Sequence, residues 1–171
     1  SHERTARVIA TQTQSTCVVL DYHRSPEAQF PVQRDEVLAC IEWIRRDDLQ
    51  WGFKAQKLIL WGESAGATLA ALAAGQLRDR GQPQVDAMVL FYGNFNGPGP
   101  GTRAQSLWVW QQLLGDRFEH PPAQAIPTRC DVRGWPATWL AAGDADPLLK
   151  DTSLLAGLLQ QARSEEHTSE L

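Results

Sequence analysis

Residues 57–75 of this chain, KLILWGESAGATLAALAAG, restrict its fold more than any other stretch. They open with an apolar run of strand length, from Lys57 to Trp61, and continue into an alanine-rich segment that strongly favours helix. Gly81 stands where such a helix would end. So few residues separate the two that the backbone must turn sharply at Ser64. The sequence therefore predicts a strand, a tight turn that carries Ser64, and a helix over 65–80.

The rest of the chain repeats this alternation of strand and helix. Apolar runs bounded by polar, Gly or Pro residues predict buried strands at 16–22, 57–61, 86–92 and 136–143. Helical patterns predict helices at 1–13, 32–46, 65–80 and 104–115, and a last helix after the loop that starts at 144. Such an order favours right-handed βαβ units around a mostly parallel sheet with flanking helices. The expected fold class is α/β.

Four tryptophans could either pack in the core or shape a substrate pocket: Trp108, Trp110, Trp135 and Trp139. Two of them fall in the predicted helix over 104–115. Together with Leu113 and Leu114, Trp108 and Trp110 are expected to form the apolar face of that helix.

Composition and charge exclude several classes of protein. A chain of 171 residues with 43% hydrophobic and 21% charged residues is expected to form one soluble domain. The net charge of −4 and the scattered Lys and Arg residues argue against a nucleic-acid partner, and no run suits a membrane span or signal peptide. Cys17, Cys40 and Cys130 are odd in number, widely spaced and without a C-x-x-C pair, so neither a zinc site nor a disulfide framework is indicated. We expect a cytoplasmic protein without metal or cofactor, and the sequence leaves its oligomeric state open.

Gly62-Glu63-Ser64-Ala65-Gly66 is a G-x-S-x-G pattern between the predicted strand and helix. At such a turn a serine is held in a strained conformation with its hydroxyl exposed, and the flanking glycines let strand and helix approach closely. The N–H of Ala65, at the helix N-terminus, can then stabilise an oxyanion. Ser64 is therefore predicted to be a nucleophile. The alternative is a serine that only caps the helix.

A serine nucleophile needs a base and a carboxylate that orients the base. In sheet hydrolases the acid follows the serine in the chain, and the base follows the acid. Asp144 and Asp146 follow the last predicted strand, at the end where the sites of open α/β sheets lie. Asp146 could instead be the N-cap of the next helix, with Pro147 as its first residue.

None of the four histidines fits the role of base. His23 and His120 precede the predicted acid, and His2 falls in the first predicted helix. His167 lies within 163–171, a segment that resembles, residue for residue, the translation of a widely used sequencing-adapter oligonucleotide. We expect 163–171 to be an artefactual tail, and the alternative is a natural polar terminus.

Several stretches together resemble the hormone-sensitive-lipase-like esterases, in particular their bacterial acetyl-esterase-like members. They are VVLDYHRSPEAQFP at 18–31, GESAG at 62–66, VLFYG at 89–93 and ATWLAAGDADPLLKDTSLL at 137–155. The resemblance implies an α/β-hydrolase fold, Ser64 as the nucleophile and Asp146 as the triad acid. It also implies a supporting role for the loop that carries Asp21, Tyr22, Pro26 and Glu27.

The chain departs from this family in two residues and in its extent. Glu63 stands where the family has Asp, which lengthens a supporting carboxylate, and His23 stands where it has Arg. The H-G-G-G oxyanion loop of the family would lie before Ser1, and its catalytic His beyond 162. We therefore expect residues 1–162 to be a fragment of an α/β-hydrolase domain.

The function expected from these residues is carboxylic-ester hydrolysis through a serine acyl-enzyme, with a small-molecule ester as substrate. The resemblance implies short acyl groups such as acetyl. The fragment by itself is expected to be inactive, because the base and the oxyanion loop fall outside it. Two alternatives stay open: a non-catalytic binding or vestigial protein on the hydrolase fold, and an amidase or peptidase on the same fold.

Overall fold

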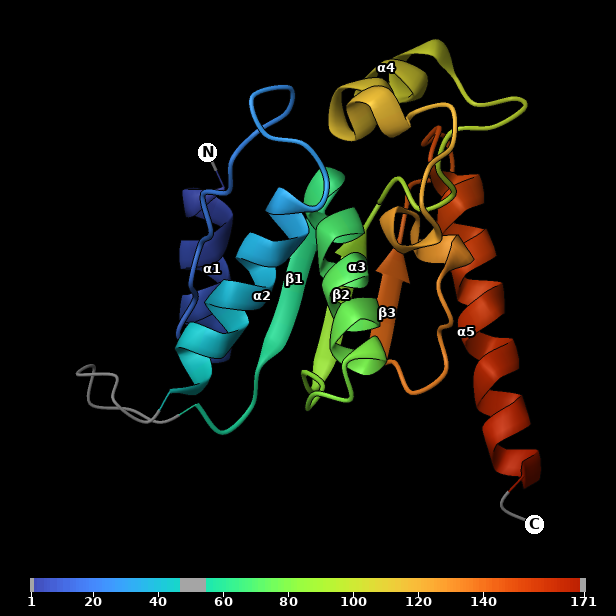
Figure 1. Ribbon diagram of the computed structural model, residues 1–171. Helices are drawn as coiled ribbons and strands as arrows, with labels where there is room; N and C mark the ends of the chain where they lie inside the picture. Colours follow the sequence, from blue (N-terminus) through green and yellow to red (C-terminus); the bar gives the residue numbers. More distant parts are fainter. Residues whose placement is uncertain (1, 47–54, 170–171) are drawn as a thin grey trace.

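The computed structural model describes residues 2–46 and 55–169, with side chains described up to residue 163. In the described part the helices are α1 (Glu3–Thr13), α2 (Val32–Arg45), α3 (Ala65–Asp79), α4 (Ala104–Leu114) and α5 (Leu149–Ser169). The strands β1 (Ile59–Glu63), β2 (Ala87–Phe91) and β3 (Ala137–Ala141) pair in parallel in the order β1-β2-β3 (Figure 1). Three short 3₁₀ segments join α4 to β3: η1 (Gly115–Arg117), η2 (Ala123–Ala125) and η3 (Pro127–Arg129). The predicted α/β class with a parallel sheet and flanking helices is confirmed.

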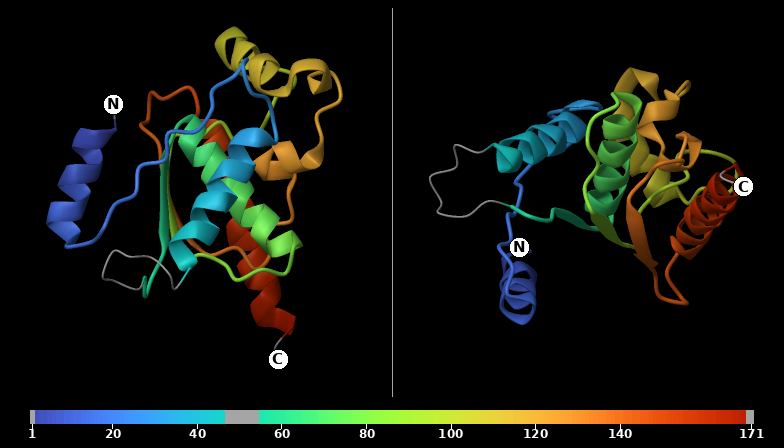
Figure 2. Two further views of the ribbon diagram at one scale, coloured as in Figure 1. Left: turned by 60° about the vertical axis from the view of Figure 1, so that its left-hand side comes forward. Right: turned by 90° about the horizontal axis from the view of Figure 1, so that it is seen from below.

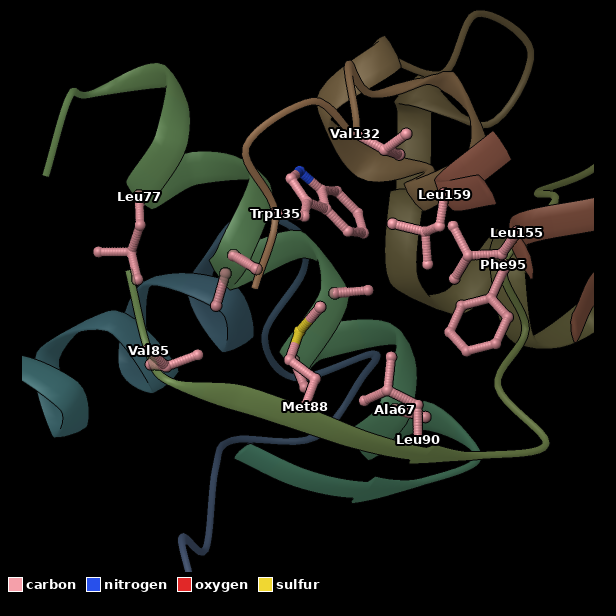
Figure 3. Packing of buried hydrophobic residues seen from close by; sticks show 14 of the residues in the cluster. Ala67, Leu77, Val85, Met88, Leu90, Phe95, Val132, Trp135, Leu155 and Leu159 are labelled. Carbon is pink, nitrogen blue, oxygen red and sulfur yellow. The ribbon is translucent and has the colours of Figure 1, made fainter. Parts of the chain in front are cut away.

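The core lies between the sheet and the layer that contains α2, α3 and α5, whereas α1 lies on the opposite face of the sheet (Figure 2). Met88 and Leu90 of β2 are fully buried against α3, whose small residues allow close packing. Figure 3 shows Ala67 of α3, Phe95, Trp135 and the α5 residues Leu155 and Leu159 converging on them. Alternate residues of the strands therefore face α3.

The sequence predicted buried strands, but only one face of the sheet is buried. On the face where α1 lies, Ile59 is 54% exposed, Trp61 44% and Trp139 54%. The ring centroid of Phe91 lies 4.7 Å from that of Trp61 and 5.1 Å from that of Trp139. The prediction failed because α1, which lies on this side of the sheet, leaves these side chains exposed.

The predicted strand at 16–22 is wrong. These residues form no regular element, and Val18 and Val19 are 41% and 55% exposed. A strand needs a neighbour to pair its N–H and C=O groups. The described sheet provides none for this segment, so its β-branched residues are not enough.

The other predicted elements are found, with small changes at their ends. β1 begins at Ile59 and extends through Glu63, because its register with β2 pairs Glu63 with Phe91. On α4 the predicted apolar face is partly wrong, since Trp110 is buried but Trp108 is 61% exposed. The backbone of α5 continues to Ser169. The artefactual origin of 163–171 stays a prediction.

Candidate active site

Ser64 occupies a strained turn between β1 and α3. Its φ of 51° and ψ of −119° lie in a region that non-glycine residues seldom adopt, at a cost of about 1–3 kcal/mol. The turn is held from both sides, because the Ser64 N–H donates to Phe91 O of β2 at 3.0 Å and the Ser64 carbonyl accepts the N–H of Ala67 at 3.0 Å. The predicted sharp turn and its strain are thus observed.

The side chain of Ser64 does not serve the helix. Ser64 stands at the N-cap position of α3 but its hydroxyl makes no capping hydrogen bond, and the residue is exposed. The capping alternative is therefore wrong in this structure. The N–H of Ala65, the first of α3, donates to no protein acceptor within the described residues, and so it is available to an anion.

The two glycines of the motif differ in what they contribute. A Cβ at Gly62 would lie 2.5 Å from the backbone N of Ala67 and from the backbone C and O of Gly66. Only glycine allows β1 and α3 to approach this closely. At Gly66 a Cβ would meet nothing within 4 Å among the described residues. The prediction that both glycines are needed for the close approach of strand and helix therefore holds for Gly62 alone.

Glu63 points away from α3. Alternate strand residues face opposite sides, and Gly62 is the one that faces the helix. The Glu63 Oε2 atom accepts a hydrogen bond from the Tyr92 hydroxyl at 3.0 Å and lies 3.8 Å from His2 Nε2. The lengthened carboxylate therefore connects the end of β1 to the residue that follows β2 and to the start of α1.

Tyr92 also connects β2 to β3. The sequence motifs did not single out Tyr92, because its contacts with Glu63 and Ala141 join separate strands. Its N–H donates to Ala141 O at 2.7 Å, and its φ of 37° is positive. Burial raises the pKa of its hydroxyl, and the hydrogen bond and charge of Glu63 and the charge of Asp146 raise it further. Tyr92 thus lies between the loops that carry the predicted nucleophile and the predicted acid.

Asp146 forms the turn that leads into α5. Its Oδ1 accepts the Leu148 N–H at 2.8 Å, and its carbonyl accepts the Leu149 N–H at 3.1 Å. The alternative role as a local cap is therefore real, although α5 begins at Leu149 and not at Pro147. Asp146 Oδ2 accepts no hydrogen bond from the described residues, which leaves it free for a base. Asp144 is exposed.

None of the described histidine side chains pairs with the predicted nucleophile or acid. His23 pairs with Glu36, whose hydrogen bond and charge raise the pKa of the imidazole. His120 lines an open cavity of about 680 Å³ beside α4, which contains none of the predicted site residues. His2 contacts Glu63, and the side chain of His167 lies outside the described residues. No described histidine forms a hydrogen bond or ion pair with Ser64 or Asp146.

Two further findings bear on what the site could bind. Among the described residues, no group of three or more His, Cys, Asp and Glu side chains could hold a metal ion. In the same part of the chain, no helix is both long and apolar enough to cross a bilayer.

Comparison with known proteins places this geometry in a family. A family model described as alpha/beta hydrolase fold matches residues 1–171. The chain belongs to the alpha/beta hydrolase family. Within it, the predicted resemblance to hormone-sensitive-lipase-like members is confirmed.

Several solved esterases share the fold of this α/β hydrolase. A Pyrobaculum calidifontis esterase matches with a TM-score of 0.86 and 26% identity over 94% of this chain and 57% of its own. An esterase of the bacterial hormone-sensitive lipase family matches with a TM-score of 0.73 and 25% identity over 84% of this chain and 51% of its own. A Pseudomonas putida esterase, at 21% identity, has the same fold with a TM-score of 0.85. The chain thus spans little more than half the length of these esterases.

Asp151 fixes the loop that follows β2, at the same edge of the sheet as Ser64. Its Oδ2 accepts the N–H groups of Phe95 and Asn96, each at 3.0 Å, and so ties the loop after β2 to the first turn of α5. We expect Asp151→Ala to lower the free energy of unfolding by about 2–3 kcal/mol, because two charge-assisted hydrogen bonds are lost. Urea denaturation of the purified chain measures this change.

Asp144→Ala is the matched control for Asp151→Ala, because Asp144 is exposed and accepts no hydrogen bond from the described residues. Its stability is expected to stay within about 0.5 kcal/mol of the unmodified chain. Equal losses in the two variants would contradict the role assigned to Asp151.

Proposed function

We propose that the protein containing this chain hydrolyses carboxylic esters with short acyl groups through an acyl-enzyme on Ser64. The observation that carries the proposal is the left-handed backbone of Ser64, with φ at 51°, which exposes a hydroxyl that caps no amide. A serine held in this way between a strand and a helix is typical of a nucleophile. The esterases among its structural relatives support the substrate class.

In the proposed reaction, the Ser64 hydroxyl attacks the ester carbonyl carbon while a histidine base takes its proton. The Ala65 N–H donates to the oxyanion that forms, and Asp146 orients the base. The bond from the carbonyl carbon to the alkoxide oxygen then breaks, and the histidine protonates the alkoxide. The alcohol leaves, and the acyl group stays bound to Ser64 as the acyl-enzyme. Water attacks the acyl group, the same histidine accepts and returns the proton, and the carboxylic acid leaves. No step needs a metal or cofactor.

The base and the remaining oxyanion donors are proposed to come from polypeptide outside residues 1–162. The chain covers 57% of the Pyrobaculum calidifontis esterase, which is consistent with this. The isolated chain would then be inactive. We also propose that residues 163–171 do not belong to the natural protein. The whole enzyme is proposed to act in the cytoplasm. Sequencing the DNA on both sides of the reading frame tests this: an H-G-G-G loop is expected upstream and a histidine-containing loop downstream of Ala162.

The activity itself is tested on the full-length protein. We expect turnover of p-nitrophenyl acetate and butyrate, slower turnover of the octanoate, and labelling of Ser64 by a fluorophosphonate probe, located by peptide mass spectrometry. The 171-residue chain is expected to show little labelling. Preference for an acetanilide over the esters would indicate an amidase or peptidase. An unlabelled Ser64 in the full-length protein would contradict the proposal and favour a binding or vestigial protein.

A further inference from the structure

Tyr92 has a conformation that its place in the sheet does not predict. The register pairs Glu63 with Phe91, so these two side chains share one face, and the Trp61–Phe91 ring contact of 4.7 Å agrees with this. In a regular strand, Tyr92 would point to the opposite face, toward α3. Its hydroxyl nevertheless donates to Glu63 Oε2 at 3.0 Å. The positive φ of 37° at Tyr92 is what allows the ring to reach the face of Glu63.

The surroundings of Tyr92 keep its hydroxyl a hydrogen-bond donor. The residue is half-buried, Glu63 accepts a hydrogen bond from its hydroxyl, and the charge of Asp146 also acts on it. Both carboxylates disfavour a phenolate, so the hydroxyl stays protonated at neutral pH. The Tyr92 N–H is bonded to Ala141 O, which fixes the ring's starting point relative to β3. The proposed reaction uses none of these contacts.

The Glu63 carboxylate could hinder the proposed reaction, because its negative charge opposes that of the oxyanion. It directly precedes Ser64, and a carboxylate that swung toward Ser64 would repel the oxyanion expected at the Ala65 N–H. The Tyr92 hydroxyl donates a hydrogen bond to Glu63 Oε2, and His2 Nε2 lies 3.8 Å from the same oxygen. Both groups draw the carboxylate toward the face of the sheet on which α1 lies.

We propose that Tyr92 is a positioning residue whose hydroxyl holds the Glu63 carboxylate away from the oxyanion formed at Ser64. This inference rests on the proposed function of Ser64. Its distinctive consequence is that the hydroxyl matters only while residue 63 carries a charge. A role of the Tyr92 ring in packing would not depend on that charge.

A double-mutant cycle in the full-length protein tests this. Tyr92→Phe is expected to lower kcat for p-nitrophenyl acetate, and the rate of fluorophosphonate labelling of Ser64, by about three- to tenfold with KM unchanged. In the Glu63→Gln background, the same substitution is expected to have no further effect. Equal losses in both backgrounds, or no loss in either, would overturn the inference.

A second measurement does not depend on activity. The chain has two tyrosines, so the difference between the absorbance titrations of the unmodified protein and Tyr92→Phe gives the pKa of Tyr92. We expect this pKa to lie above the ordinary value of a tyrosine and to fall in Glu63→Gln, with circular dichroism recorded at each pH to verify the fold. An unchanged pKa would refute the contact and with it the inference. Failure of labelling alone, with the pKa shift present, would instead count against the proposed function.

Discussion

Replacing Ser64 with alanine is expected to lower kcat/KM of the full-length protein for p-nitrophenyl acetate by about 10⁴-fold or more, because no acyl-enzyme can form without the hydroxyl. Ser153→Ala, at an exposed position of α5, is the matched control and is expected to leave hydrolysis unchanged. A Ser64→Ala enzyme that keeps a tenth of the activity would refute the assignment of Ser64 as the nucleophile.

Ser64→Gly separates the missing nucleophile from damage to the fold. Glycine adopts the φ of 51° at this position without the strain that serine or alanine carries. The glycine variant is therefore expected to be as inactive as Ser64→Ala but to melt at a temperature no lower than the alanine variant. A lower melting temperature would show that the turn is not strained in solution.

The second large effect is expected at Gly62, where stability rather than chemistry is at stake. In Gly62→Ala the new Cβ would lie 2.5 Å from backbone atoms of Gly66 and Ala67, so α3 must move away from β1. We expect a loss of about 2–4 kcal/mol in the free energy of unfolding, measured by urea denaturation. That loss is a large part of the stability of an ordinary domain.

Gly66→Ala is the control for this prediction, since its Cβ would meet nothing within 4 Å in the described structure. Gly66 lies in the first turn of α3, where alanine is the better helix former, so stability is expected to stay the same or rise by up to about 1 kcal/mol. If Gly66→Ala were as damaging as Gly62→Ala, the close approach of β1 and α3 would not be the reason that glycine is needed at Gly62.

Local interactions explain why the sequence predicted this turn well. Only Gly62 to Ser64 lie between the apolar run and the alanine-rich helix, so chain connectivity leaves few conformations for the nucleophile position. The same holds for the loop of Asp146, which follows β3 directly. The sequence left two roles open for Asp146, a local cap before α5 and the acid of a triad. The hydrogen bond from the Leu148 N–H to Asp146 Oδ1 is the one expected of a cap, and it does not exclude the role of acid.

Non-local interactions decided the features that the sequence predicted wrongly. The segment 16–22 has strand composition but no partner strand in the described sheet. The face of the sheet that carries Trp61 and Trp139 stays largely exposed among the described residues, although α1 lies on that side. Trp108 has the same residue type as buried Trp110 but lies on a side of α4 that the described residues leave exposed. Burial depends on which elements meet, and hydrophobicity alone does not specify this.

The sequence by itself determined the order of strands and helices from residue 32 onward, the position of Ser64 between a strand and a helix, and the acidic loop that follows the last strand. It could do so because periodicity, glycine placement and chain connectivity act over a few residues. Only the tertiary structure decided that Gly62 and not Gly66 is sterically required, and that Glu63 meets His2 and Tyr92. These contacts join residues from separate elements, so they exist only in the folded chain. The contact of Glu63 with Tyr92, for example, needs the parallel register that places Glu63 beside Phe91.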